Sequence, residues 1–166
     1  RYHIDQKRFG VMGESAGGYL TCMAALVKDK KYDVGGYLEY SSEVQASCPW
    51  YPPTDFRGLP YESEEQCAAS AESLLMGKNV LRNQEEALAL CPVSFVTEDA
   101  PPFLIIHGNQ DHTVPFSQGE LLYDKLAEKG CDTTLLELEG ADHADLPFFQ
   151  REIWMEIAKF FQEKLL

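Results

Sequence analysis

The stretch that decides the fold is Phe9-Gly10-Val11-Met12-Gly13-Glu14-Ser15-Ala16-Gly17. It opens with a short apolar run bounded by glycine, which predicts a strand. Apolar side chains then recur at the spacing of a buried helix, at Tyr19, Met23, Leu26 and Val27. Residues 13–17 therefore form a short turn that leads directly from a strand into a helix.

This turn matches the pattern Gly-x-Ser-x-Gly, which presents a serine at the tip of a sharp strand-to-helix connection. We expect Gly13 and Gly17 to leave room, because side chains two residues before and after the serine would collide with the neighbouring turn. Ser15 would project its hydroxyl outward, and the backbone N–H of Ala16 would point at a developing oxyanion. The alternative is a serine in an ordinary glycine-rich turn.

A serine hydroxyl is a weak nucleophile and needs a base, normally a histidine oriented by a carboxylate. Where a sheet presents the serine in this way, the chain order is Ser, then Asp or Glu, then His, on loops at the carboxyl ends of the strands. Asp111 and His143 each follow a predicted strand, in this order. Ser15, Asp111 and His143 are therefore the predicted catalytic residues. Asp142 and Asp145 flank the histidine and compete as its partner.

The rest of the chain alternates strands with helices. Strands are predicted over 44–50, 103–106 and 133–139, the last as an edge strand, and an amphipathic helix runs from Phe149 to Phe160. Another helix begins where Ser117 and Glu120 have capping-box spacing, and Gly130 is placed to stop it. Alternation of this kind predicts a parallel α/β sheet.

The segment 54–99 has a different character, since it is acidic and has little strand pattern. Residues 62–76 and 84–90 are typical of exposed helices. Long excursions of this kind are either tolerated solvated segments or functional ones. The segment is thus either a solvated excursion or a lid over a site.

Composition excludes several classes of protein. The chain has 166 residues, of which 45% are hydrophobic, so it is one domain and not a disordered chain. A net charge of −13 argues against nucleic-acid binding, and no apolar run is long enough to span a bilayer. The five cysteines have no Cys-x-x-Cys spacing and read as reduced, mostly buried thiols, which favours a cytoplasmic protein.

Residues 8–18 resemble the nucleophile segment of α/β-hydrolase esterases, closest to the bacterial acetyl-esterase, xylan-esterase and feruloyl-esterase-like branch. The segments 44–56, with Trp50-Tyr51-Pro52-Pro53-Thr54-Asp55-Phe56, and 101–118 resemble later parts of that branch. The resemblance implies the C-terminal portion of an α/β-hydrolase fold, with a mostly parallel sheet of about four strands flanked by helices. Residues 1–166 would form a partial catalytic domain, with 54–99 as a cap-like excursion.

The resemblance also implies a function. The chain would belong to a serine carboxylic-ester hydrolase acting on short acyl esters, such as acetylated or feruloylated sugars, with no metal or organic cofactor. Trp50, Tyr51 and Phe116 are candidate pocket walls, with plain packing as the alternative. A prolyl-oligopeptidase-like peptidase shares the fold and the triad order, but its elbow commonly has an aromatic residue where this chain has Ala16. A non-catalytic fragment and a metal site are further alternatives; the metal site would use Asp111, His112, Asp142, His143 and Asp145.

The sequence departs from the family in several places. The family often has Gly-x-Gly-His-Gly at the histidine, where this chain has Gly140-Ala141-Asp142-His143-Ala144, and Cys91 stands where serine is expected before proline. We expect Cys91 to serve packing. The family also places about four strands and a second oxyanion loop before the nucleophile strand. We therefore expect strand 9–12 to be an exposed edge, buried by a missing N-terminal half or by a second copy, and the isolated chain to be poorly active.

Overall fold

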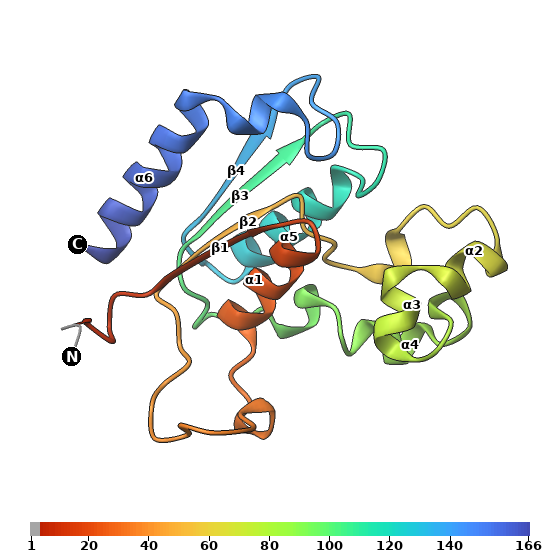
Figure 1. Ribbon diagram of the computed structural model, residues 1–166, viewed down its shortest axis with the longest axis horizontal. Helices are drawn as coiled ribbons and strands as arrows, with labels where there is room; N and C mark the ends of the chain where they lie inside the picture. Colours follow the sequence, from red (N-terminus) through yellow and green to blue (C-terminus); the bar gives the residue numbers. More distant parts are fainter. Residues whose placement is uncertain (1–3) are drawn as a thin grey trace.

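Four parallel strands form the sheet of the computed structural model, which describes residues 4–166. They are β1 (Gly10–Glu14), β2 (Ala46–Trp50), β3 (Phe103–Gly108) and β4 (Thr133–Leu138), and they lie in the order β1-β2-β3-β4 (Figure 1). The predicted α/β class is confirmed, and all four predicted strands are present with ends shifted by a few residues. The nucleophile strand β1 lies at one edge of this sheet and β4 at the other, as predicted.

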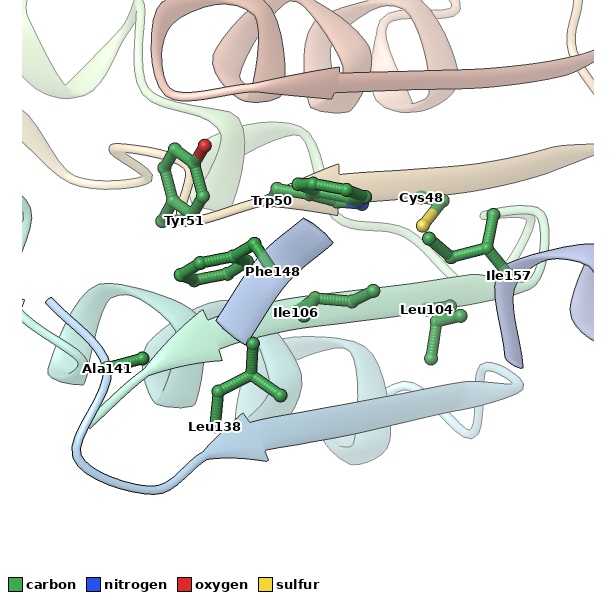
Figure 2. Packing of buried hydrophobic residues seen from close by; sticks show 9 residues of the cluster. All are labelled: Cys48, Trp50, Tyr51, Leu104, Ile106, Leu138, Ala141, Phe148 and Ile157. Carbon is green, nitrogen blue, oxygen red and sulfur yellow. The ribbon is translucent and has the colours of Figure 1, made fainter. Parts of the chain in front are cut away.

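Helices cover both faces of the sheet. The chain places α1 (Ala16–Leu26) and α5 (Ser117–Glu128) on one face and α6 (Arg151–Leu165) on the other (Figure 1). Alternate side chains of β3 serve the two faces, because successive residues of a strand point in opposite directions. Phe103 and Ile105 pack with α1 and α5, whereas Leu104 and Ile106 pack beneath α6. Figure 2 shows the α6 side, where Phe148 and Ile157 close over the sheet.

The segment 54–99 has a small hydrophobic core of its own. It contains α2 (Glu64–Ala69), α3 (Ala71–Met76) and α4 (Gln84–Leu88), together with short 3-10 turns before α2, between α3 and α4, and after α4. Buried side chains hold it together, namely Phe56, Cys67, Val80, Ala87 and Cys91. The segment also packs on α1, where the rings of Tyr19 and Phe56 lie 5.4 Å apart. It is therefore a folded extension of the domain, and it lies beside α1 (Figure 1).

Three helix predictions need correction. The single helix over 62–76 is two helices, because Ser70 leaves the helical conformation and its hydroxyl accepts from the backbone N–H of Ser73 to cap α3. The helix over 84–90 ends at Leu88. The helix from Phe149 begins only at Arg151, since Phe149 belongs to a preceding 3-10 turn (Leu146–Phe149).

The start of α5 also differs from the prediction, whereas its end does not. Ser117 makes no cap, because a tight turn already bonds the N–H groups of Gln118 and Gly119 to the carbonyls of Pro115 and Phe116. At the other end, Gly130 adopts a positive φ of 74°, and the N–H of the next residue bonds back into the last turn. Gly130 therefore ends α5 as predicted.

Two further expectations concern the chain as a whole. All five cysteines are free, with four buried and Cys131 partly exposed, as predicted. Within residues 4–166, none of the helices has the length and apolar character that a membrane crossing requires.

Candidate active site

Ser15 stands alone between β1 and α1 in an unusual backbone conformation. Its φ of 51° and ψ of −118° lie in a region that side-chain-bearing residues rarely adopt, which stores strain at the turn. The turn is held from both sides, because the N–H of Ser15 donates to the carbonyl of Trp50 and its carbonyl accepts from Tyr19. A serine at a helix start usually caps the helix with its hydroxyl, but Ser15 makes no such bond. Its hydroxyl is therefore available for another partner.

The glycines around Ser15 differ in how closely other atoms surround them, and the prediction holds for Gly13 but not for Gly17. A Cβ on Gly13 would lie 2.6 Å from the carbonyl oxygen of Gly17, so the prediction for Gly13 is confirmed. A Cβ on Gly17 would meet nothing within 4 Å, so the prediction for Gly17 is wrong. The crowded position after the serine is Gly18, where a Cβ would lie 2.6 Å from the carbonyl oxygen of Trp50. The turn thus needs glycine where β1, α1 and β2 approach one another.

The three predicted catalytic residues lie in one hydrogen-bonded chain. The hydroxyl of Ser15 lies 3.0 Å from Nε2 of His143, and Nδ1 of His143 lies 2.7 Å from Oδ2 of Asp111. Asp111 follows β3 and His143 follows β4, so parallel strands bring the groups to one edge of the sheet. Ala16 is the first residue of α1, and its N–H has no acceptor within the helix.

The environment of Asp111 keeps its carboxylate charged. Burial raises its pKa, but hydrogen bonds from His107, His143 and the backbone N–H groups of Val114 and Thr113 outweigh burial and hold the pKa well below its usual range. The two backbone bonds, both to Oδ1, measure 2.8 and 2.9 Å. A fixed anion beside Nδ1 favours the tautomer with its proton there, which leaves the Nε2 lone pair facing Ser15.

The competing aspartates face away from the imidazole. Oδ1 of Asp142 accepts from the backbone N–H groups of His112 and His143, and Oδ2 lies 3.3 Å from the ring of His112. These bonds lower the pKa of Asp142. Asp145 accepts from the backbone N–H of the next residue. Within the described part of the chain, no three His, Cys, Asp or Glu side chains are grouped so that they could hold a metal ion.

A family model described as BD-FAE matches residues 1–126 of the chain. The chain belongs to the BD-FAE family.

The chain is also similar to individual proteins. The BD-FAE chain is 30% identical over 149 residues to a probable carboxylic ester hydrolase, LipM, of Mycobacterium tuberculosis, covering 90% of this chain and 33% of LipM. It is 28% identical over 147 residues to the acylamino-acid-releasing enzyme of Mus musculus, covering 86% of this chain and 18% of that protein. A truncated carbohydrate esterase from gut microbiota has a TM-score of 0.86 at 27% identity, covering 98% of this chain and 61% of that chain. The chain has the α/β-hydrolase fold, and it spans about a third of the length of LipM.

The three aromatic residues predicted as pocket walls of this BD-FAE chain all pack against other rings. Trp50 is 3% exposed and stacks on Phe148, with ring centroids 5.8 Å apart. Phe116 packs edge-on against the buried ring of His107. Tyr51 is fully buried, and its ring lies 4.5 Å from the imidazole of His143. Trp50 therefore belongs to the core and Tyr51 packs against the histidine, and the prediction that these aromatic residues line a pocket stays a prediction.

Tyr51 also connects the histidine to the nucleophile turn. Its hydroxyl donates to Oε2 of Glu14 at 2.5 Å, and Glu14 directly precedes Ser15. Burial, followed by the hydrogen bond to Glu14, raises the pKa of Tyr51 well above its usual range, so the phenol stays protonated and remains a donor. The sequence analysis did not find this pair, because Tyr51 is distant from both Glu14 and His143 along the chain.

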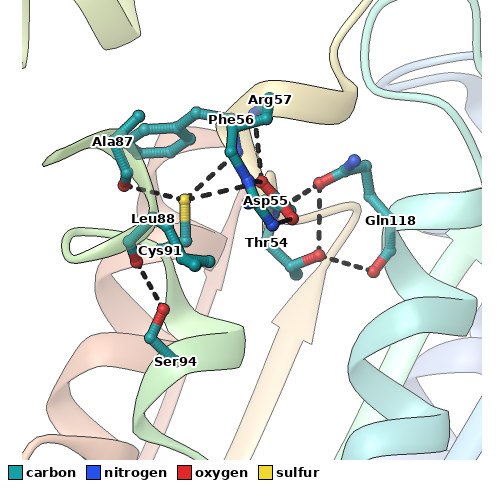
Figure 3. Close-up of polar contacts among 9 residues, drawn as sticks. All are labelled: Thr54, Asp55, Phe56, Arg57, Ala87, Leu88, Cys91, Ser94 and Gln118. Carbon is teal, nitrogen blue, oxygen red and sulfur yellow. Dashed lines mark hydrogen bonds and ion pairs between the residues drawn. The ribbon is translucent and has the colours of Figure 1, made fainter. Parts of the chain in front are cut away.

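A polar junction that the sequence analysis missed holds the loop after β2 (Figure 3). Oε1 of buried Gln118 accepts from the N–H groups of Thr54 and Asp55, at 2.8 and 2.7 Å. Cys91 does more than pack, since its sulfur accepts from the N–H of Phe56 and donates to the carbonyl of Ala87. Burial raises the pKa of Cys91 to about 11, which keeps it a thiol. The junction fixes the 54–99 segment beside α1.

An apolar groove of about 230 Å³ lies beside the nucleophile turn. Its walls come from the first turns of α1, from Pro53 and Phe56, and from α3. None of the predicted pocket residues lines it. The signal that could have found it is the pair Leu74-Leu75, which interrupts an otherwise acidic segment.

Proposed function

We propose that this chain carries the catalytic residues of a serine carboxylic-ester hydrolase. The observation that supports it best is the position of His143, whose two ring nitrogens face Ser15 and Asp111 at 3.0 and 2.7 Å. Such a chain of nucleophile, base and orienting carboxylate is the arrangement that activates a serine. The named esterase relatives favour esters as the substrates.

The proposed reaction has two halves. Nε2 of His143 accepts the proton of Ser15 as Oγ attacks the ester carbonyl carbon, and the N–H of Ala16 donates to the resulting oxyanion. The imidazolium, stabilised by Asp111, then gives this proton to the leaving alcohol, and an acyl-enzyme remains. A water molecule, deprotonated by His143, attacks the acyl carbon. The carboxylic acid leaves, and Ser15 regains its proton.

Short acyl esters are the proposed substrates, among them acetylated or feruloylated sugars. The likeness to a carbohydrate esterase supports a sugar as the alcohol part. The other candidate is an acyl-peptide substrate, which the likeness to an acylamino-acid-releasing enzyme favours. Both classes use the same attack by Ser15 on a carbonyl carbon.

The proposed partner of the β1 edge is a strand from outside this sheet, or a second copy of the chain. Phe9 and Met12 at this edge are 37% and 40% exposed, and an open apolar edge readily pairs with another strand. Such a partner would also be placed to supply a second oxyanion donor. Native mass spectrometry of the intact protein tests the second copy, which a monomeric mass would contradict.

The test of the function uses the intact native protein and an alkyl fluorophosphonate, followed by peptide mapping. We expect the label on Ser15, hydrolysis of p-nitrophenyl acetate, and loss of both in the Ser15→Ala variant. Absence of labelling with a folded protein would refute the proposal. Cleavage of N-acyl amino-acid amides without cleavage of acetyl esters would instead establish the peptidase alternative.

A further inference from the structure

The apolar groove beside Ser15 has no part in the mechanism described so far. We propose that it binds the acyl group of the ester, and that among short acyl esters those with an aliphatic chain longer than acetyl are cleaved fastest. The inference rests on the proposed function, and it assigns substrate selection to α1 and to the 54–99 segment.

The position of the groove indicates the acyl side of the ester. Ala16 lines the groove and directly follows Ser15, so one end of the groove lies next to the nucleophile turn. His143 must give its proton to the leaving alcohol, so the alcohol lies on the His143 side of Ser15. The groove walls include none of the residues of the loops that carry Asp111 and His143. The acyl group is the remaining carbon substituent and extends away from the histidine, toward α3 (Figure 1).

The chemistry of the walls selects an apolar group. Tyr19, Leu20, Phe56 and Leu75 present rings and aliphatic chains to the groove. The hydroxyl of Tyr19 donates to the carbonyl of Leu90 at 3.1 Å, so its proton is not free to bind a ligand. A polar substituent in the groove would lose its hydration without compensation.

The groove also has a charged wall residue, and its carboxylate disfavours anionic ligands. Glu72 lies on α3 among the groove residues. A negatively charged acyl group, such as a succinyl group, would therefore be repelled. Leu20 and Leu75 stay 64% and 59% exposed, so large apolar surfaces stand open beside the nucleophile. An aliphatic chain in the groove would cover them.

The size of the groove sets the length of the chain. A dry cavity of about 150 Å³ lined by aliphatic and aromatic side chains holds a benzene molecule, which has six carbon atoms. The groove, at about 230 Å³, has room for more than this, and far more than an acetyl group fills. Acyl chains of about four to eight carbons are the expected occupants.

The experiment compares p-nitrophenyl acetate, butyrate, hexanoate and octanoate on the intact protein. Each methylene that enters the groove raises kcat/KM about two- to fourfold, the upper value being that of full burial. The hexanoate to acetate ratio of kcat/KM is expected to exceed about tenfold. In the Leu75→Asn variant this ratio falls by about tenfold.

The matched control is Leu74→Asn, because Leu74 neighbours Leu75 on α3, is 71% exposed and does not line the groove. This variant keeps the wild-type ratio. A ratio that does not rise with chain length, or an equal effect of both variants, would overturn the acyl-groove inference while acetate hydrolysis preserves the proposed function. If no ester is cleaved and Ser15 is not labelled, the proposed function fails and the inference fails with it.

Discussion

Two aspartates lie close to His143, but only one of them faces its imidazole ring. The carboxylate of Asp111 is 2.7 Å from Nδ1, whereas that of Asp142 is bonded to two backbone N–H groups and faces His112. The role of each carboxylate follows from what it contacts, not from its distance to the histidine along the chain.

Replacing these two aspartates should therefore have unequal effects. Asp111→Asn presents an amide to Nδ1 and favours the wrong tautomer, so kcat should fall by about 10³–10⁴. Asp142→Asn keeps its acceptor oxygen for the backbone and should change kcat less than about threefold. Ester hydrolysis measured for both variants checks this. Comparable losses would show that Asp142 shares the orienting role.

The hydrogen bond between Tyr51 and Glu14 is a second contact that bears on the site, because Glu14 directly precedes Ser15 and the ring of Tyr51 packs against His143. Tyr51→Phe keeps the ring against His143 but removes the donor to Glu14. Since hydrogen bonds to charged groups contribute about 1.5–3 kcal/mol when buried, and Glu14 is exposed, the free energy of unfolding should fall by about 1 kcal/mol. Tyr51→Ala also removes the ring and should lower kcat more than Tyr51→Phe does. Urea unfolding and ester hydrolysis of the two variants separate these effects, and equal kcat values would contradict a role for the ring.

At the scale of elements, the nucleophile turn depends on close contact between β1, α1 and β2. Gly13 faces the backbone of α1 and Gly18 faces the end of β2, whereas Gly17 faces open space. The pattern Gly-x-Ser-x-Gly is thus satisfied in this chain by two glycines of unequal importance. The distances predict which of them tolerates a side chain.

The matched substitutions are Gly13→Ala and Gly17→Ala. In Gly13→Ala the new methyl group must displace the α1 backbone, which should lower stability by about 1–3 kcal/mol and kcat by about 10²-fold, because the nucleophile moves with it. In Gly17→Ala the methyl group meets open space, and the better helix propensity should raise stability by up to about 1 kcal/mol. Thermal unfolding and ester hydrolysis of both variants test this, and a loss of activity in Gly17→Ala alone would reverse the assignment.

For the whole molecule, three packed groups of side chains place the site. On the α6 face, Phe148 packs against Tyr51, and Tyr51 packs against His143. The core on the α1 and α5 face packs against the sheet, and the 54–99 core holds Phe56 and α3 beside the nucleophile turn. Different hydrophobic cores therefore support His143 and the groove walls formed by Phe56 and α3. Changes in the 54–99 core should alter substrate selection before they alter the hydrogen-bonded chain of Ser15, His143 and Asp111.

The buried charge of Asp111 links the stability of the molecule to pH. Its pKa is lowered by folding from an unfolded value of about 3.9, so the unfolded state binds the proton more readily. The stabilisation is fully present above about pH 4 and is lost as the pH falls below this value. Urea unfolding between pH 3 and pH 6 should show a shallower acid decline in Asp111→Asn than in the wild type. Parallel declines would show that other groups dominate.

The order of strands and helices, the nucleophile turn and the three residues of the hydrogen-bonded chain could all be predicted from the amino-acid sequence. This is possible because apolar periodicity specifies each element, and because the carboxyl ends of parallel strands must meet at one edge of the sheet. Asp111 and His143 follow from this rule together with the chain order Ser, Asp, His, since each lies after a strand. The end of α5 at Gly130 was found because a positive φ favours glycine.

The side-chain neighbours of these residues depend on how the elements pack in three dimensions. The contacts of Tyr51 with Glu14 and His143 depend on side-chain directions across segments far apart in the chain. The split at Ser70, the bonds of Gln118 and Cys91, and the groove walls depend on how the 54–99 segment packs on α1. Local sequence carries no information about such distances, because a contact between separate elements is set by the packing of the whole domain.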